Sequence, residues 1–382
     1  MLQLLREWPP GYGGVERVAH ELANAWAEQH DDVAVFSLLA QPAFARQSDP
    51  LPVHYKRITL PRWGLNELLI PLPSPQLIRM LWSTRALHAH LPCPAVLLLA
   101  ALAKGIQPKR VVTVHWHAFL AESRSLKGRL MQLYQAVALA LLPLFDRVVT
   151  TSPALQQALI ESGLKPTSIA VLPCCLSSQQ EQTALSQPIQ ASTDTSAEPA
   201  LRLISISRLG SYKRIDWLLE AVGQANQTLI HRGENIRLQV DVIGDGPDRQ
   251  HLETLSQQRL PGMVSFHGRV DEAQKMDLLK RADLLVLLAS SCNEAFGIVQ
   301  LEAMACAVPA VALALRRSGM HWVSDTKTLQ WEGTLTDLPA LIVDLACDPL
   351  LQQRARQAAR ARYLEVFARQ RWLRELQKAF KP

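Results

Sequence analysis

The chain has 382 residues, of which 48% are apolar, enough for the cores of two or three domains. No stretch reaches the roughly 18 uninterrupted apolar residues of a membrane-spanning helix. Met1 is followed at once by a short apolar run and a charged pair, which predicts no signal peptide. The six cysteines form no C-x-x-C pair, so neither a zinc site nor a disulfide framework is expected, and a reducing compartment fits.

The net charge of +6 is concentrated at the carboxyl terminus. Residues 349–382 hold nine Lys or Arg residues against two Glu, a net charge of +7. Such a segment is either a solvated helix face or a surface for anionic lipid headgroups or phosphates. No recognition motif and no pattern of stacking aromatics accompanies it, so nucleic acid is not expected as a partner.

Over the first 176 residues, apolar runs typical of buried parallel strands alternate with segments of helical periodicity. Strands are predicted at 1–7, 33–38, 85–90, 110–114, 146–151 and 168–172, and helices at 15–29, 95–104 and 127–145. Residues 41–75 are rich in proline and receive no assignment. The alternation predicts a doubly wound α/β sheet.

Two loops of this first half follow predicted strands. Gly13 and Gly14 lie between the first strand and the first helix, where a glycine pair can cradle an anion, although it is more often only a tight turn. His115 and His117 follow the strand at 110–114 and are candidates for substrate contact. The alternative for both histidines is packing without a ligand.

Residues 177–199 are rich in Ser, Thr, Gln and Pro with almost no large apolar residue, which predicts a linker. The alternation then restarts, with strands at 201–206, 237–243, 264–266 and 282–288, and helices at 215–225 and from Phe296 to Pro309. We predict a second α/β domain at 200–348 that faces the first, 1–176, across a cleft. Residues 349–382 are predicted to form a long basic helix that reaches back to the first domain.

Polar features follow each predicted strand of the second half. Arg208 and Lys213 come after the first strand, Gly244-Asp245-Gly246 after the second, Arg269 after the third and Glu294 after the fourth. Each feature alone is commonly a solvated loop or a turn. Because the carboxyl ends of parallel strands share one edge of a sheet, we expect the four to gather there. The two cations would suit a diphosphate.

The stretch 293–305 carries the most specific pattern. Glu294 and Gly297 fall just past a strand and at the mouth of the predicted helix, where free amides and the helix dipole favour an anion. Gly297 permits close approach to the backbone. Glu302 follows Glu294 by eight positions, and two carboxylates suit neutral hydroxyls. A sugar nucleotide offers both hydroxyls and a diphosphate.

Several motifs are absent. The sequence has no Walker loop, no G-x-G-x-x-G after the first strand and no G-x-S-x-G, which disfavours nucleotide hydrolysis, dinucleotide redox chemistry and α/β-hydrolase chemistry. No D-x-D pair lies in a loop, so no metal ion is required. Arg208 and Lys213 would then neutralise the phosphates.

Residues 294–305 resemble the E-x7-E signature of retaining GT-B glycosyltransferases of family 4. Residues 13–18 resemble the glycine loop of that family, and Ser207-Arg208-Leu209 with Lys213 and residues 243–247 resemble its donor-domain motifs. The resemblance implies the GT-B architecture, in which two Rossmann-like domains face each other across a cleft. It implies a hexosyltransferase that uses a nucleotide sugar.

A narrower similarity is to bacterial exopolysaccharide α-mannosyltransferases. Residues 88–94 are similar to their H-x-P-x-P segment, 112–115 to a strand that ends in a functional histidine, and 318–323 to their T-G-V-P-W-V segment. This similarity implies GDP-mannose as donor and a polyprenyl-diphosphate-linked oligosaccharide as acceptor. It places the chain in the cytoplasm, peripherally on the inner face of the membrane, with no cofactor beyond the nucleotide sugar. Basic and apolar surface that includes residues 124–145 and the C-terminal tail is expected to hold it there.

The resemblance also implies residue roles. Glu294 would contact the hydroxyls of the transferred sugar, His115 would lie near sugar and acceptor, and Arg208 and Lys213 would hold the diphosphate. The nucleotide sugar would be bound by Gly14, Gly244, Gly246, Arg269, Phe296, Gly297, Ile298 and Glu302. Glu302 would take the ribose. The leaving phosphate would accept the acceptor's proton on the front face, so no protein nucleophile is expected.

The chain departs from the family pattern at a few positions. Ala307 stands where glycine is usual, Leu288-Ala289 replaces a common Pro-Ser, and residues 326–330 are degraded. Two alternatives therefore stay open. One is a glycosyltransferase that uses a UDP-sugar and another acceptor, and the other is a non-catalytic GT-B-like binding protein.

Overall fold

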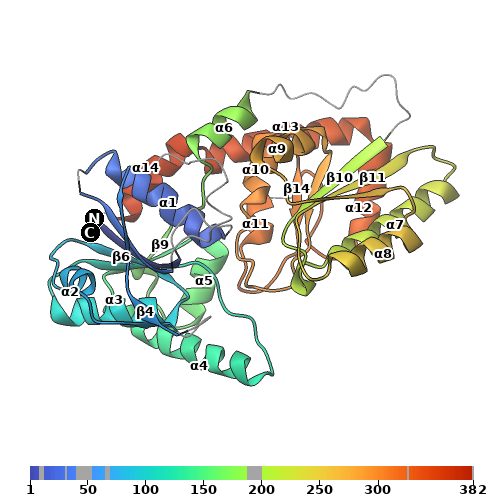
Figure 1. The fold of residues 1–382 in the computed structure, drawn as a ribbon. Helices are drawn as coiled ribbons and strands as arrows, with labels where there is room; N and C mark the ends of the chain where they lie inside the picture. The colour runs from blue at the N-terminus through green and yellow to red at the C-terminus, as the bar shows by residue number, and fades with distance from the viewer. Residues whose placement is uncertain are drawn as a thin grey trace. The chain divides into compact units, whose positions relative to one another are not determined.

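The computed structural model describes residues 1–7, 13–30, 32–39, 54–64, 69–186, 200–324 and 327–380. The chain divides into two compact units (Figure 1). Unit 1 comprises Met1–Cys175 and Trp372–Pro382, and unit 2 comprises Leu176–Arg371. Among the described residues, no helix is both long enough and apolar enough to cross a bilayer.

Unit 1 is built on a seven-stranded, wholly parallel sheet in the order β3-β2-β1-β6-β7-β8-β9. The strands are β1 (Leu2–Glu7), β2 (Ala34–Leu39), β3 (Lys56–Thr59), β6 (Leu87–Leu91), β7 (Val112–Trp116), β8 (Arg147–Thr150) and β9 (Ile169–Val171). All six strands predicted for the first half are present. The edge strand β3 is largely exposed and has no apolar run to reveal it.

Helices connect the strands of unit 1, as parallel pairing requires. They are α1 (Gly14–Ala27), α2 (Pro75–Leu81), α3 (Pro94–Ile106), α4 (Leu126–Leu141) and α5 (Pro153–Glu161), with short 3-10 turns η2 (Leu142–Leu144) and η3 (Pro166–Ser168). A small antiparallel pair joins β4 (Arg62–Trp63) to β5 (Ile70–Pro71). Serine caps fix several helix starts; the Ser125 hydroxyl, for example, accepts a hydrogen bond from the Gly128 amide at 3.0 Å.

Unit 2 is built on a five-stranded parallel sheet in the order β12-β11-β10-β13-β14. The strands are β10 (Ala200–Ile206), β11 (Arg237–Ile243), β12 (Val264–Gly268), β13 (Leu284–Leu287) and β14 (Ala310–Ala312). The helices are α6 (Ser178–Leu185), α7 (Ile215–His231), α8 (Arg249–Arg259), α9 (Glu272–Arg281), α10 (Val299–Ala305), α11 (Met320–Ser324), α12 (Leu338–Cys347) and α13 (Pro349–Arg362). The predicted α/β class, with two doubly wound parallel sheets, is confirmed.

The predicted linker at 177–199 is wrong in its first part, because Ser178–Leu185 forms helix α6. Ser177 and Gln180 make a capping box, in which each side chain accepts a hydrogen bond from the other residue's amide. The Gln180 side chain also donates to Glu272 at 2.9 Å, which ties α6 to unit 2. The serine and glutamines that suggested a linker instead cap and begin a helix. Residues 187–199 lie outside the described residues.

The carboxyl-terminal segment is not the single helix predicted for 349–382. Helix α13 is followed by a π-helical turn, η5 (Tyr363–Phe367), and by α14 (Arg369–Ala379). Residues up to Arg371 belong to unit 2, and only Trp372–Pro382 belongs to unit 1. There the Trp372 indole N–H donates to the carbonyl of Pro173 at 2.9 Å.

A buried ion pair fixes α13 to the sheet of unit 2. Arg356 Nη2 lies 2.6 Å from Asp283 Oδ1, and both side chains are less than 5% exposed. Asp283 Oδ2 also accepts the Arg202 amide at 2.8 Å, and Arg356 donates to the Ala282 carbonyl at 2.9 Å. These bonds compensate two charges that would otherwise be costly to bury.

The basic tail is therefore not a free, lipid-facing surface over its whole length. Besides Arg356, three of its guanidinium groups donate to backbone carbonyls of unit 2: Arg360 to Ala184 and Leu185, Arg362 to Trp322, and Arg369 to Leu176. Only the basic side chains of the tail that are not bound in this way could face anionic lipid.

The Arg356→Met substitution should lower the free energy of unfolding by roughly 3–5 kcal/mol, because it leaves the Asp283 carboxylate buried without its counter-charge. Urea denaturation followed by circular dichroism measures the change. The matched control is Arg354→Met, two residues away on α13, where a 65% exposed guanidinium lies 3.8 Å from Asp348. That exposed pair should contribute less than about 1 kcal/mol. Equal losses in the two variants would contradict the assignment.

Candidate functional site

The strand order of unit 2 reverses once, at β10. Successive strands β11 and β12 extend the sheet to one side of β10, and β13 and β14 extend it to the other. The loops that leave β10 and β13 therefore lie next to each other at the carboxyl edge, where ligands bind in open α/β sheets, and the Ser290 amide of the second loop donates to the Tyr212 carbonyl of the first at 2.8 Å. Lys213 lies on the first of these loops and Glu294 on the second.

Lys213 and Glu294 meet at this reversal point. Lys213 closes the short turn η4 (Ser211–Lys213), and its Nζ forms an ion pair with Oε2 of Glu294. The side chains are 9% and 22% exposed, so the pair is largely enclosed but open on the glutamate side. A cation for a phosphate and a carboxylate for a hydroxyl are thus held in direct contact.

The segment Ser318–Val323 holds the backbone of the Glu294 loop. The Ser318 hydroxyl donates to the carbonyl of Glu294 at 2.7 Å, and the Gly319 amide donates to the carbonyl of Ala295 at 2.8 Å. These two hydrogen bonds fix the loop backbone, and the buried Phe296 ring adds an edge-on contact with Phe367. Sequence reasoning quoted this segment only for its resemblance and did not foresee that contact.

Helix α10 begins at Val299, so the prediction that it starts at Phe296 is wrong. Gly297 has a φ of +73°, and an added Cβ would overlap the Leu287 side chain, which explains why a glycine stands there. Phe296, Gly297 and Ile298 consequently lie in the loop. With only seven residues, α10 supports the predicted helix-dipole argument less than a long helix would.

Glu302 lies in the first turn of α10 and is 1% exposed. Its Oε2 lies 2.9 Å from Nζ of Lys275 on α9, and the same ammonium lies 2.9 Å from Glu272. The two carboxylates of the predicted signature are therefore held by two different lysines. Sequence reasoning missed Lys275, which has no motif of its own. Ribose binding by Glu302 stays a prediction and requires the ribose to share this carboxylate with Lys275.

The glycines after β11 have a structural role. A Cβ on Gly244, which has a φ of +130°, would overlap the carbonyl oxygen of Ser207, and one on Gly246 would overlap that of Leu209. The loop after β11 can thus lie directly against the loop after β10. Gly244 and Gly246 shape the site through this backbone packing, and their contact with a ligand stays a prediction.

Two exposed arginines stand at the same carboxyl edge. Arg208 follows β10 and Arg269 follows β12. Within the described part of the chain, Arg208 makes no ion pair and no side-chain hydrogen bond, so its guanidinium is available to an anion. The edge thus combines a paired lysine with exposed positive charge.

Ala307 occupies the left-handed region, with a φ of +59°, directly after α10. This is the position where helices commonly end in glycine, because an L side chain is strained there. The structure thereby gives the physical reason for the glycine that is usual in the resembled family. Of the degraded segment 326–330, Thr326 lies outside the described residues.

In unit 1, Gly14 is exposed at the start of α1, directly after β1 and its loop. The neighbouring Gly13 has no room for a Cβ, because Oε2 of Glu16 occupies that space. Burial raises the pKa of Glu16. Residues 8–12 of the predicted glycine-rich loop lie outside the described residues, and the anion-binding role of Gly14 stays a prediction.

His115 is fully buried, so the structure does not present it to a ligand at the strand end. Its ring stacks on that of His117 with centroids 4.0 Å apart, and His117 Nε2 lies 2.9 Å from His90 Nδ1. Strand alternation explains the burial, because every second residue of β6 and β7 points to the same face. On that face Trp26 of α1 and Phe380 pack edge-on against His88.

This histidine cluster (His88, His90, His115 and His117) also invites a test as a metal site. The donor atoms of His88, His90 and His115 lie within 4.8 Å of one another. However, the rings of His90 and His115 are nearly parallel, 14° apart, so their in-plane lone pairs do not converge on one ion. Both ring nitrogens of His90 are also engaged, by His117 and by Gln3. The arrangement therefore fits packing better than coordination.

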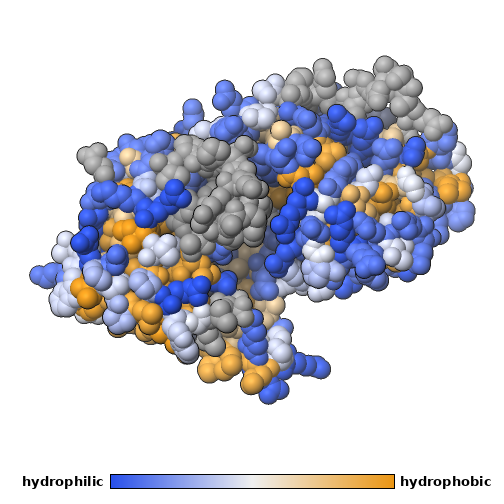
Figure 2. All heavy atoms as spheres, viewed as in Figure 1, coloured by the Kyte–Doolittle hydropathy of each residue, from blue (hydrophilic) through white to orange (hydrophobic). Residues whose placement is uncertain are grey.

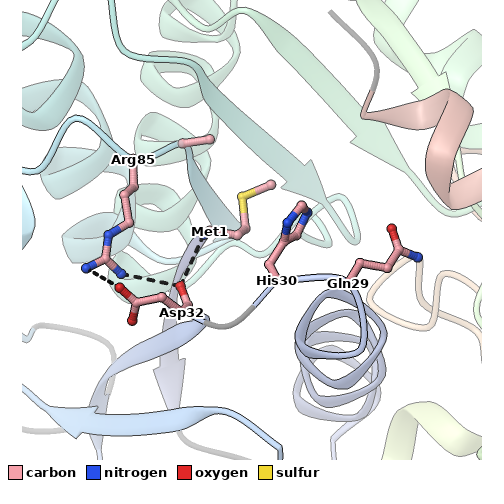
Figure 3. Close-up of a pocket in the computed structure, with 6 residues that line it drawn as sticks. Met1, Gln29, His30, Asp32 and Arg85 are labelled. Atoms are coloured by element: carbon pink, nitrogen blue, oxygen red, sulfur yellow. Dashed lines mark hydrogen bonds and ion pairs between the residues drawn. The ribbon is translucent and has the colours of Figure 1, made fainter.

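An open pocket of about 500 Å³ lies elsewhere, at the amino-terminal edge of the unit 1 sheet. Figure 3 shows its lining side chains, among them Arg85, which is paired with Asp32 at 2.7 Å. Met1, at the start of β1, contributes to the lining. This edge is opposite to the strand carboxyl ends, so the pocket carries none of the predicted site residues.

Known proteins match both halves of the chain. Residues 12–180 match the family described as Glycosyltransferase Family 4, and residues 190–362 match Glycosyl transferases group 1. The O-antigen chain mannosyltransferase C of Escherichia coli is 24% identical over 328 residues, which cover 84% of this chain and 80% of that protein. The GtfA subunit of a Streptococcus agalactiae UDP-N-acetylglucosamine–peptide N-acetylglucosaminyltransferase is 30% identical over 115 residues. That match covers 30% of this chain but only 21% of the relative's length.

Solved structures show the same fold. HepE of Anabaena, crystallised in complex with UDP-glucose, superposes with a TM-score of 0.70 at 19% identity, over 99% of this chain and 98% of that one. WaaG, described as a glycosyltransferase of lipopolysaccharide biosynthesis, superposes with a TM-score of 0.64 at 16% identity, over 99% of this chain and 98% of that one.

Stability should fall as the pH drops below about 6.5, because burial lowers the pKa of all four clustered histidines, that of His115 to about 3. As the pH falls below the pKa of a histidine in the unfolded chain, the unfolded chain binds protons at these imidazoles, whereas the folded chain keeps them neutral. Each such proton makes the free energy of unfolding fall by about 1.4 kcal/mol per pH unit. Urea unfolding at pH 7.5, 6, 5 and 4.5 measures the slope.

Replacing His115 with Phe should remove about one proton from that uptake and so make the slope of stability against pH shallower. The control is His251→Phe at an exposed position, which should leave the slope nearly unchanged. The neutral packing of the cluster would be refuted if the wild type were as stable at pH 4.5 as at pH 7.5.

Proposed function

We propose that this chain, whose two halves match the family 4 and group 1 glycosyltransferase models and which has the GT-B fold, transfers a hexose to a lipid-linked oligosaccharide with retention of configuration. The proposed donor is GDP-mannose, and the proposed setting is exopolysaccharide or lipopolysaccharide assembly. The chain would work in the cytoplasm, peripherally on the inner face of the membrane. The observation that carries the proposal is the contact between Lys213 and Glu294 where the strand order of unit 2 reverses.

Lys213 and Arg208 supply the charge that a diphosphate leaving group needs. As the bond between the anomeric carbon and the phosphate oxygen breaks, negative charge grows on that oxygen, and the two cations stabilise it. The leaving oxygen takes the proton of the acceptor hydroxyl, whose oxygen forms the new bond on the same face of the sugar. With these cations and no D-x-D pair in the sequence, the proposed reaction needs no resident metal.

Glu294 positions the sugar. Its carboxylate is held by Lys213 and by the fixed loop backbone, and it is exposed enough to accept hydrogen bonds from sugar hydroxyls. The contact with Lys213 occupies this carboxylate, which suits a positioning group better than a general base. A glycosidase would instead use two carboxylates as nucleophile and acid, whereas here the other carboxylate of the signature, Glu302, is engaged by Lys275.

The choice of mannose rests on similarity to the O-antigen mannosyltransferase over most of the chain. A UDP-sugar is the second candidate, supported by the fold shared with HepE, which was crystallised with UDP-glucose. The largely buried Lys213–Glu294 pair argues against the non-catalytic alternative.

A thermal-shift panel of nucleotide sugars tests the donor. GDP-mannose at about a hundredfold excess over its Kd should stabilise the chain by about 2.7 kcal/mol. UDP-glucose, UDP-N-acetylglucosamine and free mannose are the comparisons. Selective stabilisation by a UDP-sugar would replace mannose with the second candidate, and no response to any nucleotide would support the non-catalytic alternative.

Lys213→Met should reduce kcat by about 10²–10³-fold, the usual cost of removing one charge that stabilises the transition state. Glu294→Gln keeps the shape of the side chain and should also reduce transfer, with a larger share of the loss in KM for the sugar donor. Transfer is measured with radiolabelled sugar nucleotide and extracted lipid-linked acceptors. The control is Arg281→Met, an exposed cation of the same unit. Near-wild-type transfer in either site variant would refute the proposed site.

A further inference from the structure

Exposed apolar side chains are unevenly divided between the units. Among the described residues, thirteen of the sixteen exposed large apolar side chains belong to unit 1. Three belong to unit 2, among them Ile230 and Leu350. Single exposed leucines need no explanation, but a concentration of them on one unit marks an interaction surface.

The largest group follows one face of α4. Leu126, Leu130, Leu133 and Val137 recur at helical spacing and are 76%, 55%, 63% and 47% exposed, and Leu144 continues them just past the helix at 56%. We name these five residues the α4 stripe. Figure 2 shows apolar atoms gathered over α4, at the lower edge of the view.

Helix α4 is also anchored, so the stripe is not free to turn inward. Gln135 and Ala138, on the other side of the helix, are buried. Oε1 of the Gln135 side chain accepts a hydrogen bond from the Leu120 amide at 2.6 Å. The Gln132 side chain donates to the backbone carbonyls of Leu120 and Ala121 at 3.0 and 2.8 Å. Two glutamines of α4 are therefore bound toward the protein while the leucines of the stripe face outward, although apolar residues of a surface helix usually face the core.

Positive charge accompanies the stripe. Arg124, Lys127 and Arg129 are exposed at the amino-terminal end of α4, and no acidic residue occurs from Ser123 to Phe145. A surface that combines apolar side chains with uncompensated cations is complementary to an anionic bilayer, which offers both an acyl boundary and phosphate groups. A protein partner would need an apolar groove with acidic rims, for which the chain gives no sign.

We propose that α4 docks this chain onto anionic phospholipid, lying in the plane of the interface. The α4 stripe enters the acyl boundary while Arg124, Lys127 and Arg129 contact the lipid phosphates. The inference deepens the proposed function, on which its biological meaning rests, because it names the surface that brings the chain to a lipid-linked acceptor. It also narrows the membrane surface expected from the sequence, residues 124–145 and the basic tail, to α4, because several arginines of the tail are bound inside unit 2.

Co-sedimentation with vesicles tests the proposal. The wild-type chain should bind vesicles of equal parts phosphatidylglycerol and phosphatidylcholine, and bind pure phosphatidylcholine much more weakly. Leu130→Ser with Leu133→Ser should weaken binding to the anionic vesicles at least about tenfold. Lys127→Gln with Arg129→Gln should weaken it as well and remove much of its salt dependence.

The matched control is Ile230→Ser with Leu350→Ser, two equally exposed apolar residues of unit 2, which should bind as the wild type does. Circular dichroism melts establish that every variant is folded. Unchanged vesicle binding in the stripe variant would overturn the proposal. So would a wild type that ignores vesicles but dimerises through the stripe, shown by a monomeric variant in analytical ultracentrifugation.

The outcome is separable from the proposed function. Vesicle binding uses no nucleotide sugar, and the donor panel uses no lipid. If the chain binds anionic vesicles through α4 but no nucleotide sugar, docking stands and the proposed transfer fails. If the chain binds a nucleotide sugar but the stripe variant still binds vesicles, the donor proposal stands and docking through α4 fails.

Discussion

The reversal of strand order at β10 is the constraint on which the candidate site depends. Strands are added to both sides of β10, so the loops that follow β10 and β13 are neighbours at the carboxyl edge, and the chain places a lysine on one loop and a glutamate on the other. The Lys213 ammonium also lies over the Tyr212 ring of its own loop at 5.1 Å, but its counter-charge comes from the other loop. The ion pair therefore depends on the strand order of the sheet, and Gly244 lets the loop after β11 lie directly against the backbone of Ser207.

Three carboxylates of unit 2 are each held by a cation: Glu294 by Lys213, Glu302 by Lys275 and Asp283 by Arg356. Pairing lowers the cost of burying these charges, and it fixes the positions of the side chains. The Arg356–Asp283 pair anchors α13, whereas the other two pairs hold the carboxylates of the E-x7-E pattern.

In unit 1, polar histidines are buried and apolar leucines are exposed. Its histidine cluster is packed inside against aromatic side chains, and leucines of α4 stand outside. Burying four imidazoles is tolerable because burial keeps them neutral and stacks them on one another. Exposing the leucines is costly in water and becomes favourable at a lipid surface.

Periodicity alone determined the two parallel sheets, because long apolar runs and helical repeats are local properties of the chain. It missed β3 and placed a linker over α6, where an exposed edge or a capping box overrides composition. The E-x7-E pattern marked Glu294 and Glu302, but only the tertiary structure paired each with its own lysine and buried His115. Which side chains meet depends on strand order and on what covers each face, and those are contacts between residues far apart in the sequence.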